Sequence, residues 1–233
     1  MDEPVAEERL GMAGHALYMS TTPKIEGYEC KDIHCFKAIY EEWIDLLTEL
    51  AKQWKQGGDF PWWYNERASL SLFAGAIWLA GGHCLEEYSE KKREIRRQTH
   101  RLGNPYTGRI DLYFSWHRFD FIAEAKATWS GFTHGNKSAR HRLVGGLKEA
   151  RNAIRGAEPD RRQRRLAILF ARPYFKKRAE ERIDELLNTW VASLADLDTS
   201  SYAWGFPQCV RHKYADDGNC YPGEAVLIRE VWK

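Results

Sequence analysis

The sequence lacks the cysteine spacing, the long apolar runs and the one-sided charge that mark several protein classes. Its 233 residues include five cysteines, an odd number with no Cys-x-x-Cys pair. Free thiols in a reducing compartment are therefore expected rather than a disulfide framework. No apolar segment approaches the length of a membrane span, and residues 1–9 are acidic without a hydrophobic stretch. We therefore expect a cytoplasmic protein with neither a secretory signal nor a membrane partner.

Three common catalytic motifs are also missing. The chain contains no Walker-type glycine-rich phosphate loop, no Gly-x-Ser-x-Gly nucleophile elbow and no His-Glu-x-x-His helix. These absences argue against a P-loop nucleotidase, an α/β-hydrolase and a zincin-type protease.

What the chain does contain is a pair of segments, residues 108–116 and 119–126, that alternate apolar and polar side chains. A period of two is typical of half-buried strands. The predicted apolar face consists of Ile110, Leu112, Phe114 and Trp116 in the first segment and Phe119, Phe121, Ala123 and Ala125 in the second. The opposite face carries Asp111, Glu124 and Lys126.

The turn between these strands decides what their polar face does. A hairpin centred on residues 117–118 pairs Leu112 with Ala123 and Asp111 with Glu124. Side chains opposite one another have Cβ atoms roughly 4.5–5.5 Å apart, so two carboxylates there repel unless a cation neutralises them. Mg²⁺ prefers such oxygen ligands. The alternative is a solvated strand face with a surface ion pair, which contributes about 0–1 kcal/mol.

The same residues resemble a known motif. Asp111, twelve intervening residues and then Glu124-Ala125-Lys126 look like the PD-(D/E)xK nuclease superfamily, which includes many restriction enzymes and archaeal Holliday-junction resolvases. Ile110 stands where the motif's name has proline, a departure that members often show. The resemblance implies an α/β sandwich with a restriction-endonuclease-like core: a helix, a three-stranded antiparallel meander, a second helix and a further strand.

The resemblance also implies a chemistry. Asp111, Glu124 and the Ala125 carbonyl would hold Mg²⁺ or Mn²⁺, and Lys126 would orient or deprotonate the attacking water. The protein would then be an endonuclease acting on nucleic acid, DNA rather than RNA, and a homodimer would suit the cutting of both strands. The alternative is a nuclease-like module that binds nucleic acid or protein without cleaving.

Residues 65–80 are expected to form the first core helix. Asn65 can cap its start, Gly81-Gly82 ends it, and its apolar positions recur at helical spacing: Leu70, Phe73, Ala74, Ile77 and Trp78. The helix of the resembled family often brings a further glutamate, for which Glu66 is the best match and Glu87 a substitute. Glu66 also fits as an acid that favours the helix dipole.

The remaining elements extend this core. Residues 138–155 and 176–194 are expected to be helices, and residues 83–88, 166–170, 202–206 and 225–232 to be strands. Residues 30–56 look like one amphipathic helix that packs on the core. We therefore expect residues 1–58 to be a tail and an added helix, residues 59–233 to be the nuclease-like domain, and the whole to be compact.

Net charge is only +2, so any nucleic-acid contact must come from local clusters. The candidates are Lys91, Lys92, Arg93, Arg96, Arg97, Arg140, Arg161 and Arg162. Basic clusters neutralise phosphates, which dominates nucleic-acid affinity. Each cluster also fits as a solvated loop or helix end.

Overall fold

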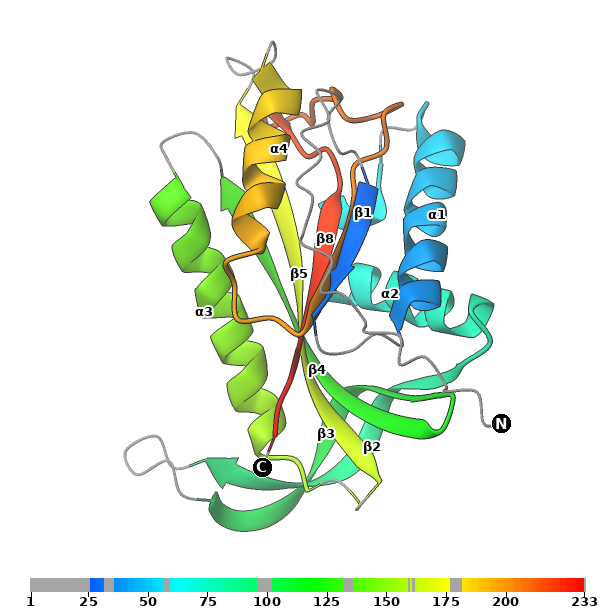
Figure 1. Ribbon diagram of the computed structural model, residues 1–233, viewed down its shortest axis with the longest axis vertical. Helices are drawn as coiled ribbons and strands as arrows, with labels where there is room; N and C mark the ends of the chain where they lie inside the picture. The colour runs from blue at the N-terminus through cyan, green and yellow to red at the C-terminus, as the bar shows by residue number, and fades with distance from the viewer. Residues whose placement is uncertain are drawn as a thin grey trace, which may run out of the picture.

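The computed structural model describes residues 26–31, 36–56, 59–95, 102–131, 136–158, 160, 162–176 and 182–232. Within them, an eight-stranded and mostly antiparallel sheet is covered by helices on both faces. Helices α1 and α2 cover one face, and α3 and α4 cover the other (Figure 1). The α/β class expected from the sequence is confirmed.

The elements follow one another along the chain without a long interruption. They are β1 (Glu26–Cys30), α1 (Lys37–Trp54), the 3-10 turn η2 (Pro61–Trp63), α2 (Glu66–Leu79), β2 (His83–Ile95), β3 (Leu102–Trp116), β4 (Phe119–Gly131), α3 (Asn136–Arg155), β5 (Gln163–Lys176), α4 (Ile183–Leu194), β6 (Ser201–Gly205), β7 (Asn219–Cys220) and β8 (Glu224–Glu230). The strand order is β1-β6-β8-β5-β4-β3-β2, and β7 pairs with β5.

The centre of this sheet has the order that the sequence indicated. Helix α2 precedes the antiparallel meander β2–β3–β4, and α3 then carries the chain to β5, which lies parallel to β4. A parallel pair needs such a crossover, and a helix usually supplies it. The added elements β1, β6 and β8 extend the sheet beyond β5.

The predicted hairpin register is also confirmed where the two strands pair. Trp116 lies opposite Phe119 and Leu112 opposite Ala123, with the turn residue His117 in the left-handed region at φ +53°. The printed pairing of β3 with β4 ends at Leu112. Asp111 therefore lies just beyond the paired part of the hairpin.

The predicted apolar face of β3 is wrong at Ile110. Leu112 packs in the core under α1 and α2, but Ile110 packs with Ile122 and Ala150 under α3. The alternation changes phase because β2 is kinked opposite this point, where Glu87 has φ +57°. A period-two pattern assumes a regular strand and does not reveal such a kink.

The N-terminal helix is shorter than residues 30–56. Cys30 ends strand β1, which pairs with β6, and α1 begins at Lys37. Pairing with a strand some 170 residues later in the chain is a tertiary effect that local periodicity does not contain. The stripe of α1 packs against the sheet as expected through Ile39, Trp43 and Leu47.

Helix α2 confirms its predicted ends. The Asn65 side chain accepts the Ala68 N–H at 3.2 Å. At the other end Gly81 has φ +93°, and its N–H donates to the Trp78 carbonyl at 3.0 Å. A left-handed glycine at this position is a common helix stop. Trp78 itself, expected in the core, is 52% exposed, because it lies at the edge of the stripe beside His83.

Strands β2 and β3 are longer than the sequence indicated. The paired portion continues past the core as a polar arm, which we call the distal arm: residues 89–95 of β2 and 102–109 of β3. Helix α4 begins at Ile183 rather than at residue 176, which ends β5. In the described ranges, every helix is too short or too polar to cross a membrane.

Candidate active site

The site forms where β3 stops pairing with β4. Just past the last paired residue of β3, the Asp111 carboxylate reaches over to β4, and its Oδ2 accepts the Ala125 N–H at 2.8 Å. A side chain thus replaces the missing ladder contact. The bond holds the Asp111 carboxylate beside residues 124–126 of β4.

Glu124 is buried, with 6% of its surface exposed. Its Oε1 accepts a hydrogen bond from the Lys92 ammonium of β2. Burial raises the pKa of the Glu124 carboxyl, the charge of Asp111 raises it further, and the Lys92 contact opposes both. The two acids are therefore close enough to repel one another, and a solvated strand face does not describe Glu124.

Lys126 connects the strand to helix α2. Its Nζ donates to the Ala125 carbonyl at 2.5 Å and lies 3.5 Å from Glu66 Oε1. Glu66 is the first residue of α2. The helix glutamate expected from the sequence thus reaches the site through its lysine.

Glu87, the substitute for Glu66, is engaged elsewhere. Its carboxylate is bonded to Arg67 of α2 and lies 2.6 Å from Arg109 Nη1. The Arg67 hydrogen bond lowers the pKa of the Glu87 carboxyl. Of the two candidate acids, Glu66 is the one that contacts Lys126.

A buried arginine fixes the start of α2, and sequence reasoning missed it. Arg172 of β5 donates to the Tyr64 carbonyl at 2.5 Å and to the Asn65 carbonyl at 2.8 Å, and its Nε donates to Glu224 Oε2 at 3.2 Å. Both charged side chains are almost fully buried. The available signal was a lone arginine directly after the apolar run of residues 166–171.

The oxygen atoms at the site suit a hard cation. They are the carboxylates of Asp111 and Glu124 and the carbonyl of Ala125, and Mg²⁺ and Mn²⁺ favour such donors. The ammonium groups of Lys92 and Lys126 contact two of these groups. Among the residues that the structure describes, no three His, Cys, Asp or Glu side chains gather as metal ligands, so any such ion would take backbone and water oxygens as well.

Comparison with models of known protein families, with curated proteins and with solved structures finds no match. Function must therefore be inferred from the side chains of the site and their surroundings.

The predicted basic clusters are only partly available to a ligand. Lys92 is bonded to Glu124, and Arg93 to Glu158. Arg140 lies 3.7 Å from Asp196, whereas Lys91 and Arg162 are exposed. Arg96, Arg97 and Arg161 fall outside the described residues.

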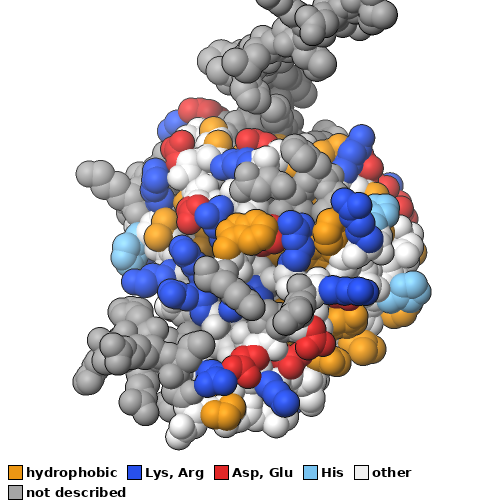
Figure 2. Space-filling view, turned by 60° about the horizontal axis from the view of Figure 1, so that its bottom comes forward, with side chains coloured by type: hydrophobic (Ala, Val, Ile, Leu, Met, Phe, Trp, Pro, Cys, Tyr) orange, Lys and Arg blue, Asp and Glu red, His pale blue; other side chains and the backbone are white. Residues whose placement is uncertain are grey.

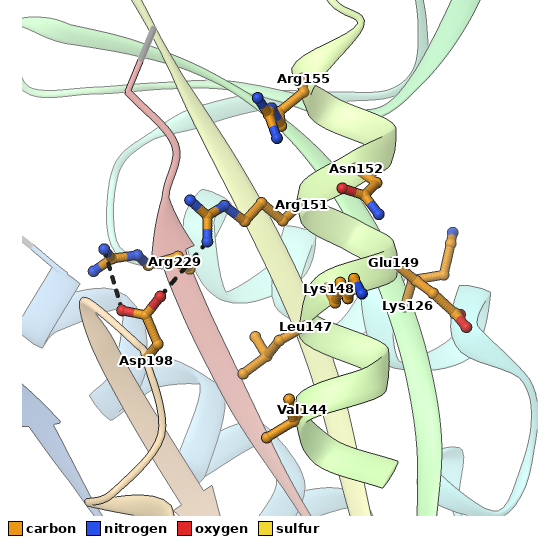
Figure 3. Close-up of a pocket in the computed structure, with 10 residues that line it drawn as sticks. All are labelled: Lys126, Val144, Leu147, Lys148, Glu149, Arg151, Asn152, Arg155, Asp198 and Arg229. Carbon is orange, nitrogen blue, oxygen red and sulfur yellow. Dashed lines mark ion pairs between the residues drawn. The ribbon is translucent and has the colours of Figure 1, made fainter. Parts of the chain in front are cut away.

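A cavity of about 960 Å³ beside α3 touches the site through Lys126. Its other charged lining residues are Lys148, Glu149, Arg151, Arg155, Asp198 and Arg229. Figure 3 shows Lys126 and Glu149 on one side of α3 and the Arg151–Asp198–Arg229 group on the other. Arg151 and Arg229 lie 3.7 and 3.2 Å from Asp198. The lining is predominantly basic.

The outer surface carries the same sign of charge nearby. Figure 2 shows Lys and Arg side chains spread across the middle of the face that contains the lower end of the sheet in Figure 1, with acidic and hydrophobic side chains between them. Such a mixed surface can contact phosphates locally without a strong net field.

The burial of Glu124 leads to a pH-dependent stability. Because burial raises the pKa of this carboxyl, the folded protein retains a proton that the unfolded chain has lost. This contribution to the free energy of unfolding is complete below the ordinary glutamate pKa and is lost as pH rises through the raised value. We expect the free energy of unfolding of the wild type, minus that of Glu124→Gln, to fall across this range. Urea titrations in EDTA measure it, and a constant or rising difference contradicts it.

Proposed function

We propose that the protein is a metal-dependent nuclease that hydrolyses phosphodiester bonds, most probably a DNA endonuclease. The observation that carries the proposal is the convergence of Asp111, Glu124, the Ala125 carbonyl and Lys126 where β3 leaves β4. The sequence resemblance supplies the substrate class, and DNA is preferred over RNA on that ground alone.

The order of elements around the site supports the same proposal. A helix, an antiparallel meander, a second helix and a parallel strand succeed one another from α2 to β5. This is the order that the PD-(D/E)xK resemblance implies, with Asp111 on the middle strand of the meander and Glu124 and Lys126 on the last. Glu66 begins the preceding helix, which is where that family often has a further glutamate.

In the proposed mechanism Asp111, Glu124 and the Ala125 carbonyl hold the cation against the scissile phosphate. A bound divalent cation supplies Lewis acidity and lowers the pKa of a coordinated water. Lys126 exchanges its contact with the Ala125 carbonyl for one with the attacking water or a phosphate oxygen. Its fixed positive charge then stabilises the charge that develops on the phosphate. Glu66, 3.5 Å from the ammonium, orients Lys126.

A second candidate is a module that binds nucleic acid or protein without cleaving. The observation that favours it is the neutralisation of the site by its own lysines, since Lys92 contacts Glu124 and Lys126 contacts the Ala125 carbonyl. A module of this kind needs no metal. Metal affinity therefore separates the two candidates.

The first test is cleavage of supercoiled plasmid and of single-stranded DNA in Mg²⁺, Mn²⁺ or EDTA. We expect nicking or linearisation with either metal and none in EDTA, because the acid pair requires a cation to act on a phosphate. Absence of cleavage under every metal, together with retained DNA binding in a mobility-shift assay, would instead support the binding module.

A further inference from the structure

The distal arm holds Lys92 in a fixed place. Its backbone is bonded to the segment that follows α3: Arg93 N–H donates to the Gly156 carbonyl at 2.6 Å, and Glu158 N–H donates to the Lys91 carbonyl at 2.9 Å. Lys92 itself forms a bridge to Ala157 between these two bonds. Lys92 therefore projects from an anchored strand and not from a free loop.

A glycine makes the reach of Lys92 possible. Lys92 lies on β2 and its partner Glu124 lies on β4, so the side chain must pass over the intervening strand β3. It passes over Gly108, where a Cβ atom would lie 2.7 Å from Lys92 Cδ and 3.3 Å from Cγ. Any larger residue at position 108 would push the lysine off this path.

Burial makes the contact energetically important. The Lys92 and Glu124 side chains are only 12% and 7% exposed. A buried carboxylate without a countercharge is costly, and Asp111 adds repulsion from the same side. Without a metal ion, Lys92 supplies the positive charge that Glu124 needs.

We propose that Lys92 is a built-in counterion of the metal site: its ammonium occupies the Glu124 carboxylate in place of a divalent cation and must release it when the cation binds. This inference rests on the proposed function, because it assumes that Glu124 is a metal ligand. Lys92 acts through Glu124 and is a positioning residue. Since the ion pair and the metal compete for one carboxylate, each weakens the other by the same factor.

The competition is tested by measuring Mn²⁺ binding without DNA. For Lys92→Met we expect Mn²⁺ affinity by titration calorimetry to rise, on the order of tenfold. We also expect a lower unfolding temperature in EDTA, because Glu124 loses its partner, and a larger rise on saturation with Mn²⁺. Gly108→Val retains every charge and should change both quantities in the same direction by displacing Lys92. Lys91→Met, an exposed neighbour on the same arm, is the matched control and should change neither.

The possible results separate this inference from the proposed function. Mn²⁺ affinity that is unchanged or weaker in Lys92→Met overturns the counterion role, while wild-type binding that is lost in Glu124→Gln leaves the nuclease proposal standing. If neither the wild type nor Lys92→Met binds Mn²⁺, the proposed function fails and the counterion role with it. Should Lys92→Met not fold, Gly108→Val decides by the same two measurements.

Discussion

The Lys126→Ala protein is expected to cleave DNA about a thousandfold more slowly than the wild type at saturating Mg²⁺, the size of effect seen when one charged or acid–base group is removed from a reacting centre. Lys126 contacts the Ala125 carbonyl and Glu66, so its ammonium lies between β4 and the first residue of α2. It is partly exposed and its ion pair with Glu66 is only half-buried. Truncation should therefore leave the free energy of unfolding within about 1 kcal/mol of wild type.

The measurement is single-turnover cleavage of plasmid, with urea unfolding of both proteins as the check on folding. Lys148→Ala is the matched control, since Lys148 lines the same basic cavity beside α3. If it retains activity within a few fold, general loss of positive charge is not the cause. Full activity in Lys126→Ala would refute the proposed mechanism. Glu124 is the less suitable position for this test, because its truncation would leave the buried Lys92 ammonium without a carboxylate.

Much of the fold was predictable because its elements are regular. The 3.6-residue stripe predicted α3, the apolar run of residues 166–170 predicted β5, and the alternation around residues 117–118 predicted the hairpin register. Each of these signals is local. Where local order breaks, as at the kink of Glu87 or at the pairing of β1 with β6, the sequence contained no readable sign.

The candidate site divides in the same way. Asp111, Glu124 and Lys126 share a hairpin, so a spacing rule brought them together. Lys92 was assigned to a solvated basic cluster, because its contact with Glu124 passes over an intervening strand at Gly108. Such contacts depend on the strand order of the sheet and on which strand carries a glycine.

Arg172 is the position where a single substitution should destabilise the fold most. Replacing it with methionine, which has a similar length, is expected to lower the free energy of unfolding by about 3–5 kcal/mol, the usual cost of removing one partner of a buried ion pair. The change leaves the fully buried Glu224 carboxylate without its arginine and removes the donors to the Tyr64 and Asn65 carbonyls. It also removes a cation–π contact with Trp129, whose ring centroid lies 5.0 Å from the guanidinium carbon.

Urea unfolding of Arg172→Met and of Arg182→Met provides the comparison. Arg182 pairs with Glu185 at the start of α4 with both side chains 64% exposed, so its loss should cost about 0–1 kcal/mol. Equal effects of the two substitutions would contradict a structural role for the buried pair.

The double variant Arg172→Met with Glu224→Met separates stability from function. Because it leaves no unpaired buried charge, it should recover much of the lost free energy of unfolding. It does not restore the donors that hold the Tyr64 and Asn65 carbonyls directly before Glu66. If Arg172 also positions the start of α2 for the chemistry, the stable double variant will still cleave DNA more slowly than wild type. Wild-type cleavage by that variant would limit Arg172 to stability and leave the placement of Glu66 to the cap formed by Asn65 and Ala68.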